Sequence, residues 1–184
     1  MKKIVILFSA MLLFTENLFA GTYKPQSNGN ILYYPNNGSN PVLVYQGTQQ
    51  ALALIDYNGE IITAFSGGGI YRSPDGQNLG GGGRTYKVYK GTQTVKAMTP
   101  CRGGVVTAFS GAGIYFSPDG QNLGGGGKTQ RVYDGTQTVK KMICENGTGL
   151  NGSDSIITTF SGGGVYKSPD GQNLGGGGKA IRLN

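Results

Sequence analysis

The stretch that decides the fold is Ser-Pro-Asp-Gly-Gln-Asn-Leu-Gly-Gly-Gly-Gly at 117–127, which occurs unchanged at 73–83 and at 168–178. The first two copies lie 44 residues apart and the last two lie 51 residues apart. A second marker, Gly-Thr-Gln, recurs with the same 44-residue spacing. Self-similarity at such a period is the signature of a repeat protein. The extra residues of the last unit fall within 145–154, a Gly-, Asn- and Ser-rich stretch that predicts a surface loop.

Each full repeat predicts four short strands. In the middle repeat these are 95–101, 105–110, 113–117 and 129–133, which are rich in Val, Ile, Tyr, Phe and Thr. Turn sequences separate them, among them Pro-Asp-Gly, in which Pro fixes φ and Gly accepts a positive φ. A half-copy before the first full repeat adds two strands, so that fourteen strands are expected in all.

These boundaries predict one domain over 21–184. Its half repeat spans about 29–47, and its full repeats span about 48–91, 92–135 and 136–184. Four strands in a unit of this length predict a β-propeller-like architecture of about 3.5 blades. A β-trefoil-like fold is the alternative, since it also uses three units of four strands, although the half-copy would be left over. Two chains would supply 28 strands, so a homodimer that closes a seven-bladed propeller is a further hypothesis.

Residues 1–20 have the features of a signal peptide. Lys2 and Lys3 precede an apolar run over 4–14, and a short polar stretch ends at Ala20. The run is too short for a comfortable membrane span, and no later stretch is long enough for one. We therefore expect a secreted, periplasmic or extracellular protein. After removal of this leader the chain keeps 14 basic and 8 acidic residues, a balance that aids solubility or attracts acidic ligands.

Cys101 and Cys144 are the two cysteines, and they occupy nearly equivalent places in successive repeats. In an oxidising compartment a disulfide between neighbouring repeats is plausible, and two buried thiols are the alternative. Neither cysteine belongs to a CxxC pair and the chain has no His, so no metal site or cofactor is expected.

The repeated Ser-Pro-Asp-Gly-Gln-Asn resembles the Asp-box of sialidase-like propellers, and also the blade turns of tachylectin-like lectins. This resemblance implies a propeller fold and a structural turn, not an activity. It departs from the Asp-box in that Gly follows Asp directly and the Trp is missing. The turn residues are Ser73, Asp75, Gly76, Ser117, Asp119, Gly120, Ser168, Asp170 and Gly171.

Catalytic motifs are weak. Without His a Ser-His-Asp triad is impossible, and no pair of carboxylates is singled out for glycan hydrolysis, so no catalytic residue is predicted. Leu-Gly-Gly-Gly-Gly-Lys-Thr at 123–129 looks like a phosphate-binding loop, but the required first Gly is Asn122 and a strand follows instead of a helix. Nucleotide binding is therefore not expected.

Repeated basic and aromatic residues favour binding over catalysis. Arg84, Lys128 and Lys179 each follow a four-Gly run, where Gly N–H groups can form an anion-binding nest. Tyr71, Tyr115 and Tyr166 share another repeat position and offer flat faces for sugars, although repeated aromatics also build cores. These six residues form the candidate ligand site. They favour a multivalent, lectin-like protein that recognises a glycan or another acidic polymer. A structural or protein-interaction module is the alternative function.

Overall fold

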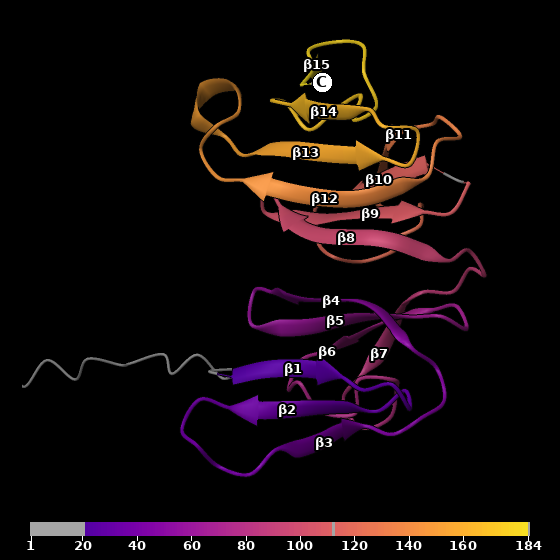
Figure 1. Ribbon diagram of the computed structural model, residues 1–184, viewed down its shortest axis with the longest axis vertical. Coiled ribbons are helices and arrows are strands. Elements are labelled where there is room, and N and C mark those ends of the chain that lie inside the picture. The colour runs from indigo at the N-terminus through magenta and orange to yellow at the C-terminus, as the bar shows by residue number, and fades with distance from the viewer. Residues whose placement is uncertain (1–20, 112, 184) are drawn as a thin grey trace, which may run out of the picture.

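The computed structural model describes residues 21–111 and 113–183, so the predicted leader lies outside the described part. The described chain forms fifteen strands in four antiparallel sheets, with one short 3-10 turn at Leu150–Gly152. The all-β, propeller-like prediction is confirmed (Figure 1). The strand count of fourteen is wrong by one, because β1 (Gly21–Pro25) was missed.

The first sheet has three strands and each later sheet has four. In chain order the remaining strands are β2 (Ile31–Pro35), β3 (Val42–Tyr45), β4 (Ala51–Tyr57), β5 (Glu60–Phe65), β6 (Ile70–Ser73), β7 (Tyr86–Tyr89), β8 (Val95–Cys101), β9 (Gly104–Phe109), β10 (Gly113–Ser117), β11 (Gln130–Tyr133), β12 (Val139–Glu145), β13 (Ser155–Phe160), β14 (Val165–Ser168) and β15 (Ile181–Arg182). Within every sheet, strands that follow one another in the chain are paired neighbours. Each sheet is therefore a meander, as in a propeller blade.

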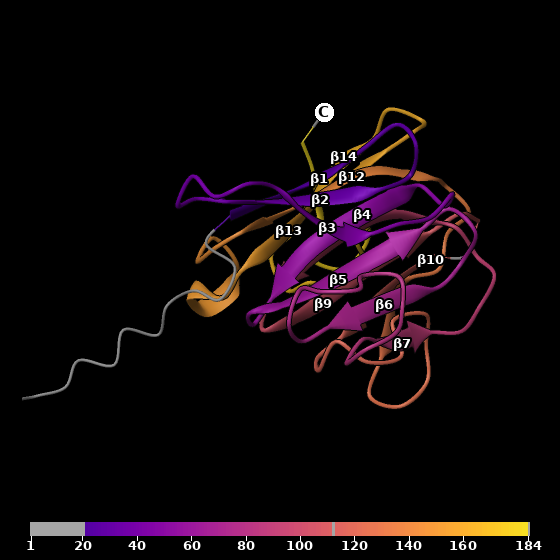
Figure 2. The same ribbon diagram turned by 90° about the horizontal axis from the view of Figure 1, so that it is seen from below.

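The four blades follow one another along the long axis of the molecule, from β1–β3 at one end to β12–β15 at the other (Figure 1). Seen from below, β4 to β7 cross the molecule in order as one blade (Figure 2). Among the first strands of the full blades, β8 lies against both β4 and β12, so these strands connect the three blades. This arrangement is an open arc of blades and not a trefoil.

The core consists of three apolar clusters, one at each junction between blades. Each is centred on a fully buried Phe from the second strand of a full blade, and these are Phe65, Phe109 and Phe160. Apolar residues on both faces of the central strands are buried, as in β9, because each central blade packs against two neighbours. Packing between repeats therefore provides most of the core.

The repeated turn explains how each blade connects its third and fourth strands. In the middle copy the Ser117 hydroxyl lies 2.6 Å from the Gln121 carbonyl oxygen, and the Gln121 N–H donates to Asp119 Oδ1 at 3.0 Å. The other two copies have the same bonds at the same distances. Gly120 has a φ of 68° and Asn122 a φ of 49°, both in the left-handed region that Gly and Asn tolerate. The side chains of the motif thus form hydrogen bonds with backbone groups of the same turn.

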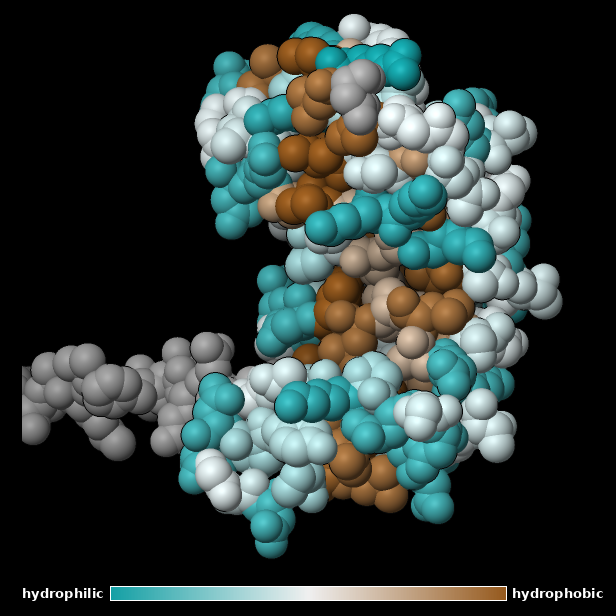
Figure 3. All heavy atoms as spheres, viewed as in Figure 1, coloured by the Kyte–Doolittle hydropathy of each residue, from teal (hydrophilic) through white to brown (hydrophobic). Residues whose placement is uncertain are grey.

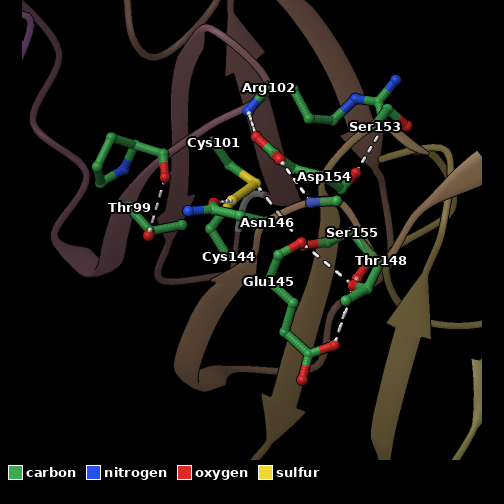
Figure 4. The surroundings of a disulfide bond; sticks show 12 residues. Thr99, Cys101, Arg102, Cys144, Glu145, Asn146, Thr148, Ser153, Asp154 and Ser155 are labelled. Atoms are coloured by element: carbon green, nitrogen blue, oxygen red, sulfur yellow. Dashed lines mark hydrogen bonds between the residues drawn. A yellow bond between two sulfur atoms is a disulfide. The ribbon is translucent and has the colours of Figure 1, made fainter.

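A disulfide joins Cys101 at the end of β8 to Cys144 in β12, and so links the third blade to the fourth (Figure 4). The inserted residues of the last repeat lie beside it as a surface loop. Arg102 anchors this loop, since its backbone N–H donates to Asp154 Oδ2 at 3.1 Å and its guanidinium donates to the Asp154 carbonyl oxygen at 2.8 Å. Within the described residues, no helix is long and apolar enough to cross a membrane.

Candidate binding grooves at the blade junctions

Three grooves recur at equivalent places, one at each junction between blades. Their volumes are about 400, 330 and 340 Å³ from the first junction to the third. One wall is the last strand of a blade, and the other is the Asn-Leu-Gly segment that follows the repeated turn of the next blade. The middle groove is lined by Lys87, Val88, Tyr89, Lys90, Gly91, Asn122, Gly124 and Gly125.

A backbone bond fixes the two walls of each groove. At the middle junction the Leu123 N–H donates to the Val88 carbonyl oxygen at 3.2 Å, and the equivalent bonds at the other junctions run from Leu79 and Leu174. The side chains of these three Leu residues are fully buried. Each groove therefore has a rigid base where a blade contacts the outer strand of its neighbour.

A tyrosine forms part of every groove and contacts a glycine across the junction. The Tyr89 ring packs on Phe109 with ring centroids 4.7 Å apart. A Cβ placed on Gly124 would lie 2.1 Å from a carbon of the Tyr89 ring, so no side chain larger than that of Gly fits there. Tyr45 and Tyr133 make the same close approach to Gly80 and Gly175. This packing requires the first glycine of each four-Gly run.

The charges of the three grooves differ. The middle groove carries two cations, Lys87 and Lys90. The third has Arg131 and Asp134 at the equivalent positions, and the first has the uncharged Leu43 and Gln46. The three grooves share their geometry but differ in charge. This combination favours one extended ligand that contacts several grooves, rather than three copies of one small ligand. The middle groove is best suited to an acidic group.

The predicted tyrosines lie in the junction clusters. Tyr71, Tyr115 and Tyr166 are half-buried and pack edge-on against the central Phe residues with ring centroids about 6 Å apart. On the neighbouring strand, Lys87 Nζ lies 5.8 Å from the Tyr71 ring centroid and the Arg131 guanidinium carbon lies 5.9 Å from that of Tyr115. All three rings contribute to the core, and a cation also lies over the rings of Tyr71 and Tyr115, which leaves little flat surface for a sugar.

The predicted basic set, Arg84, Lys128 and Lys179, lies on three separate blades. Each residue is exposed in the tight turn closed by the bridges Gly82 to Thr85, Gly126 to Thr129 and Gly177 to Ala180. Lys179 also lies close enough to Asp170 to act on its pKa. Burial raises the pKa of Asp170, but hydrogen bonds from Gln172 and Ser168 and the charge of Lys179 outweigh it, so the pKa is below its usual range.

One cluster of metal-ligating residue types occurs among the described residues: Cys101, Cys144 and Asp154. Both sulfur atoms belong to the disulfide, and the Asp154 carboxylate accepts bonds from the backbone N–H groups of Arg102 and Gly147 (Figure 4). These groups stabilise the insertion loop and leave no set of ligands for a metal.

The junction grooves were not predicted from the sequence. The tyrosine of each groove recurs at one position of the repeat, but its pairing with the first glycine of the next Gly run is a contact between repeats. The one available signal was the unchanged Gln-Asn-Leu-Gly, because a turn alone needs Asp and Gly but not the same Leu in every copy.

Two structures of YCF48 are among the solved structures that resemble this fold. "YCF48 from Cyanidioschyzon merolae" aligns with a TM-score of 0.56 and 14% identity over 87% of this chain and 54% of that chain. "YCF48 bound to D1 peptide" aligns with a TM-score of 0.51 and 14% identity over 86% of this chain and 50% of that chain. No family profile matches the sequence, and no curated protein matches it.

The chain is thus a β-propeller-like repeat protein. At this level of identity the likeness to YCF48, itself a β-propeller protein, shows the fold alone. The chain spans about half the length of both solved structures.

Proposed function

We propose that this chain is a protein-interaction module that binds an extended peptide segment of a partner protein along its junction grooves. The observation that carries the proposal is the set of three equivalent grooves with a rigid base and different charges. A peptide offers different side chains at successive positions, which matches such a series. The similar propeller that was solved with a bound peptide supports this ligand class.

Glycan binding is the competing proposal. It rests on the repeated Tyr and cation pairs, which present partly exposed rings beside positive charge. We rank it second, because those rings are packed against the central Phe residues. Closure of a seven-bladed ring by two chains remains a separate hypothesis that light scattering can test. The described part of one chain contains fifteen strands, so these parts of two chains would contain thirty strands instead of the expected 28.

We further propose that the protein works outside the cytoplasm and has no enzymatic activity. The leader-like residues 1–20 and the disulfide, which persists best in oxidising compartments, support the first point. The absence of His and of any motif for a catalytic carboxylate pair supports the second.

The test is a selection from a phage-displayed random-peptide library, followed by calorimetric titration of an enriched peptide. We expect enriched peptides to share an acidic residue. The double variant Lys87→Glu/Lys90→Glu should weaken binding at least 10-fold, since it reverses both charges of the middle groove. Lys96→Glu/Lys140→Glu makes the same charge change on exposed residues of β8 and β12 and should change the affinity less than 2-fold.

If both double variants weaken peptide binding equally, the loss of affinity comes from the change in net charge alone. That result would contradict the groove proposal. A parallel glycan array separates the two candidate functions. Binding to glycans without enrichment of any peptide would overturn the peptide proposal and leave the glycan proposal in place.

A further inference from the structure

The insertion loop of the last repeat places two oxygen-bearing side chains beside the disulfide. Asn146 Oδ1 lies 3.8 Å from Cys144 Sγ, and a carboxylate oxygen of Asp154 lies within 4.8 Å of both sulfur atoms (Figure 4). The equivalent connections, β4 to β5 and β8 to β9, are turns of only two residues, 58–59 and 102–103. A blade therefore forms without the insertion, and the loop adds oxygen atoms at the place where two sulfur atoms meet.

Reduction of the disulfide would turn these side chains into a compact set of two sulfur and two oxygen donors. With the disulfide intact, the sulfur atoms are bonded to each other and cannot act as thiolate ligands. The ligands of a tetrahedral zinc ion lie about 3.5–4 Å apart, given the usual Zn–S and Zn–O bond lengths. The donor atoms of Cys101, Cys144 and Asp154 already lie within 4.8 Å of one another. The two Cα atoms are 5.5 Å apart, so both thiolates can reach one ion without a large movement of β8 or β12.

The Asp154 carboxylate is held in place by hydrogen bonds from the backbone. Its Oδ2 accepts from the Arg102 N–H and its Oδ1 accepts from the Gly147 N–H, both at 3.1 Å. A carboxylate oxygen has two lone pairs, so each oxygen keeps one for a metal ion. Hydrogen bonds of this kind orient a ligating carboxylate. The Arg102 guanidinium, 2.8 Å from the Asp154 carbonyl oxygen, also balances the negative charge that two thiolates and a carboxylate leave around a divalent cation.

A surface cavity gives access to the cluster. It has a volume of about 270 Å³, and its lining includes Cys101, Cys144, Asn146 and Asp154. Cys144 is half-buried, whereas Cys101 is only 4% exposed. A reductant therefore reaches the Cys144 sulfur first, and a metal ion can enter by the same route.

We propose that reduction of the disulfide creates a zinc site, in which Cys101, Cys144, Asp154 and Asn146 Oδ1 are the four ligands. A dithiol gives two electrons and two protons to the disulfide and is itself oxidised to a disulfide, which leaves two cysteine thiols. Zn²⁺ then replaces the two thiol protons, which pass to the solvent. Thiolate ligands favour Zn²⁺ over Mg²⁺ or Ca²⁺, which prefer oxygen.

The zinc ion would tie the third blade to the fourth in the reduced chain, as the disulfide does in the oxidised chain. The site lies at the end of β8 and beside the insertion loop, whereas the junction grooves lie along the last strands of the blades. The zinc proposal therefore does not depend on peptide binding, and either proposal can fail without the other.

The test uses the protein expressed from its full-length sequence, reduced by a water-soluble phosphine without oxygen and titrated with Co²⁺ and then with Zn²⁺. Thiolate-bound Co²⁺ has a sulfur-to-metal charge-transfer band, and tetrahedral Co²⁺ absorbs strongly in the visible range. We expect one Co²⁺ per reduced chain with both signals, displacement by one Zn²⁺, and release of about two protons near neutral pH. The oxidised protein should show none of these changes. Zn²⁺ should also raise the melting temperature of the reduced protein but not that of the oxidised protein.

Variants of the insertion loop identify the oxygen ligands. Asp154→Asn should weaken Zn²⁺ binding by the reduced protein at least 10-fold. Glu145→Gln makes the same charge change in this region, but Glu145 Oε2 accepts a bond from Lys167 Nζ at 2.7 Å, so the affinity should change less than 3-fold. Asn146→Asp keeps the anchor of the loop and supplies a charged ligand, and it should tighten binding at least 3-fold. No stoichiometric binding by the reduced protein, no charge-transfer band, or equal weakening by Asp154→Asn and Glu145→Gln would overturn the proposal.

Discussion

At the scale of single residues, three buried threonines carry hydroxyls without a hydrogen-bond partner among the described residues. They are Thr63, Thr107 and Thr158, which hold the same position in β5, β9 and β13 and are fully buried. An unsatisfied buried hydroxyl costs about 1–3 kcal/mol, and an apolar group of the same shape avoids this cost. We therefore predict that Thr107→Val raises the free energy of unfolding by about 1 kcal/mol, as measured by denaturant titration.

Ser117→Ala is the matched comparison, since the Ser117 hydroxyl is equally buried but lies 2.6 Å from the Gln121 carbonyl oxygen. It should lower the free energy of unfolding by about 1–3 kcal/mol. If the Thr107 and Ser117 variants lose stability to the same extent, the threonine hydroxyls have partners after all.

Asp170 provides a pH dependence at the same scale. The pKa of Asp170 is lowered in the folded protein, because the bonds from Gln172 and Ser168 and the charge of Lys179 outweigh the effect of burial. Its contribution to stability is complete above the unfolded pKa of about 4 and is lost as the pH falls through the lower folded pKa. We predict that the stability difference between wild type and Asp170→Asn is largest above about pH 5 and shrinks towards about pH 2.5. Urea midpoints across this range would measure it, and a constant difference would refute it.

At the scale of elements, the junctions depend on glycines that contact tyrosines. Gly124→Ala would place a methyl group 2.1 Å from the Tyr89 ring and force the two walls of the middle groove apart. We expect a loss of about 1–3 kcal/mol in thermal or denaturant unfolding, typical of overpacking. Gly162→Ala is the control, because no atom lies within 4 Å of the place that its Cβ would take. Comparable losses in both variants would argue against the close contact.

The strands also differ in how well the sequence alone predicts them. The strands of the full repeats were predictable, because each is a short run rich in Val, Ile, Tyr, Phe and Thr that is bounded by Gly-rich turns. β1 was not predictable: Gly-Thr-Tyr-Lys-Pro has Thr and Lys where β5 has Ile61 and Thr63, and it ends in Pro, which counts against a strand. The grooves were missed for a different reason. Bonds such as Leu123 N–H to Val88 join separate repeats, and a repeat pattern does not say which surfaces meet.

At the scale of the whole molecule, stability should vary from blade to blade, since each blade packs only on its neighbours. The Cys101–Cys144 disulfide ties the last blade to the third. We predict that Cys101→Ala/Cys144→Ala costs about 2–4 kcal/mol and speeds amide hydrogen exchange most in β12 to β14, while exchange in β1 to β7 changes little. A uniform increase along the chain would mean that the arc unfolds as one unit.

The central claim is that the arc binds a protein segment in the grooves between its blades. Hydrogen-exchange mass spectrometry with and without a peptide enriched in the selection tests it most directly, because it needs no substitution. The account predicts slower exchange in the two walls of the middle groove, residues 87–91 and 122–125, with weaker protection at the neighbouring junctions. Protection confined to surfaces outside the three grooves, with these walls unchanged, would contradict it.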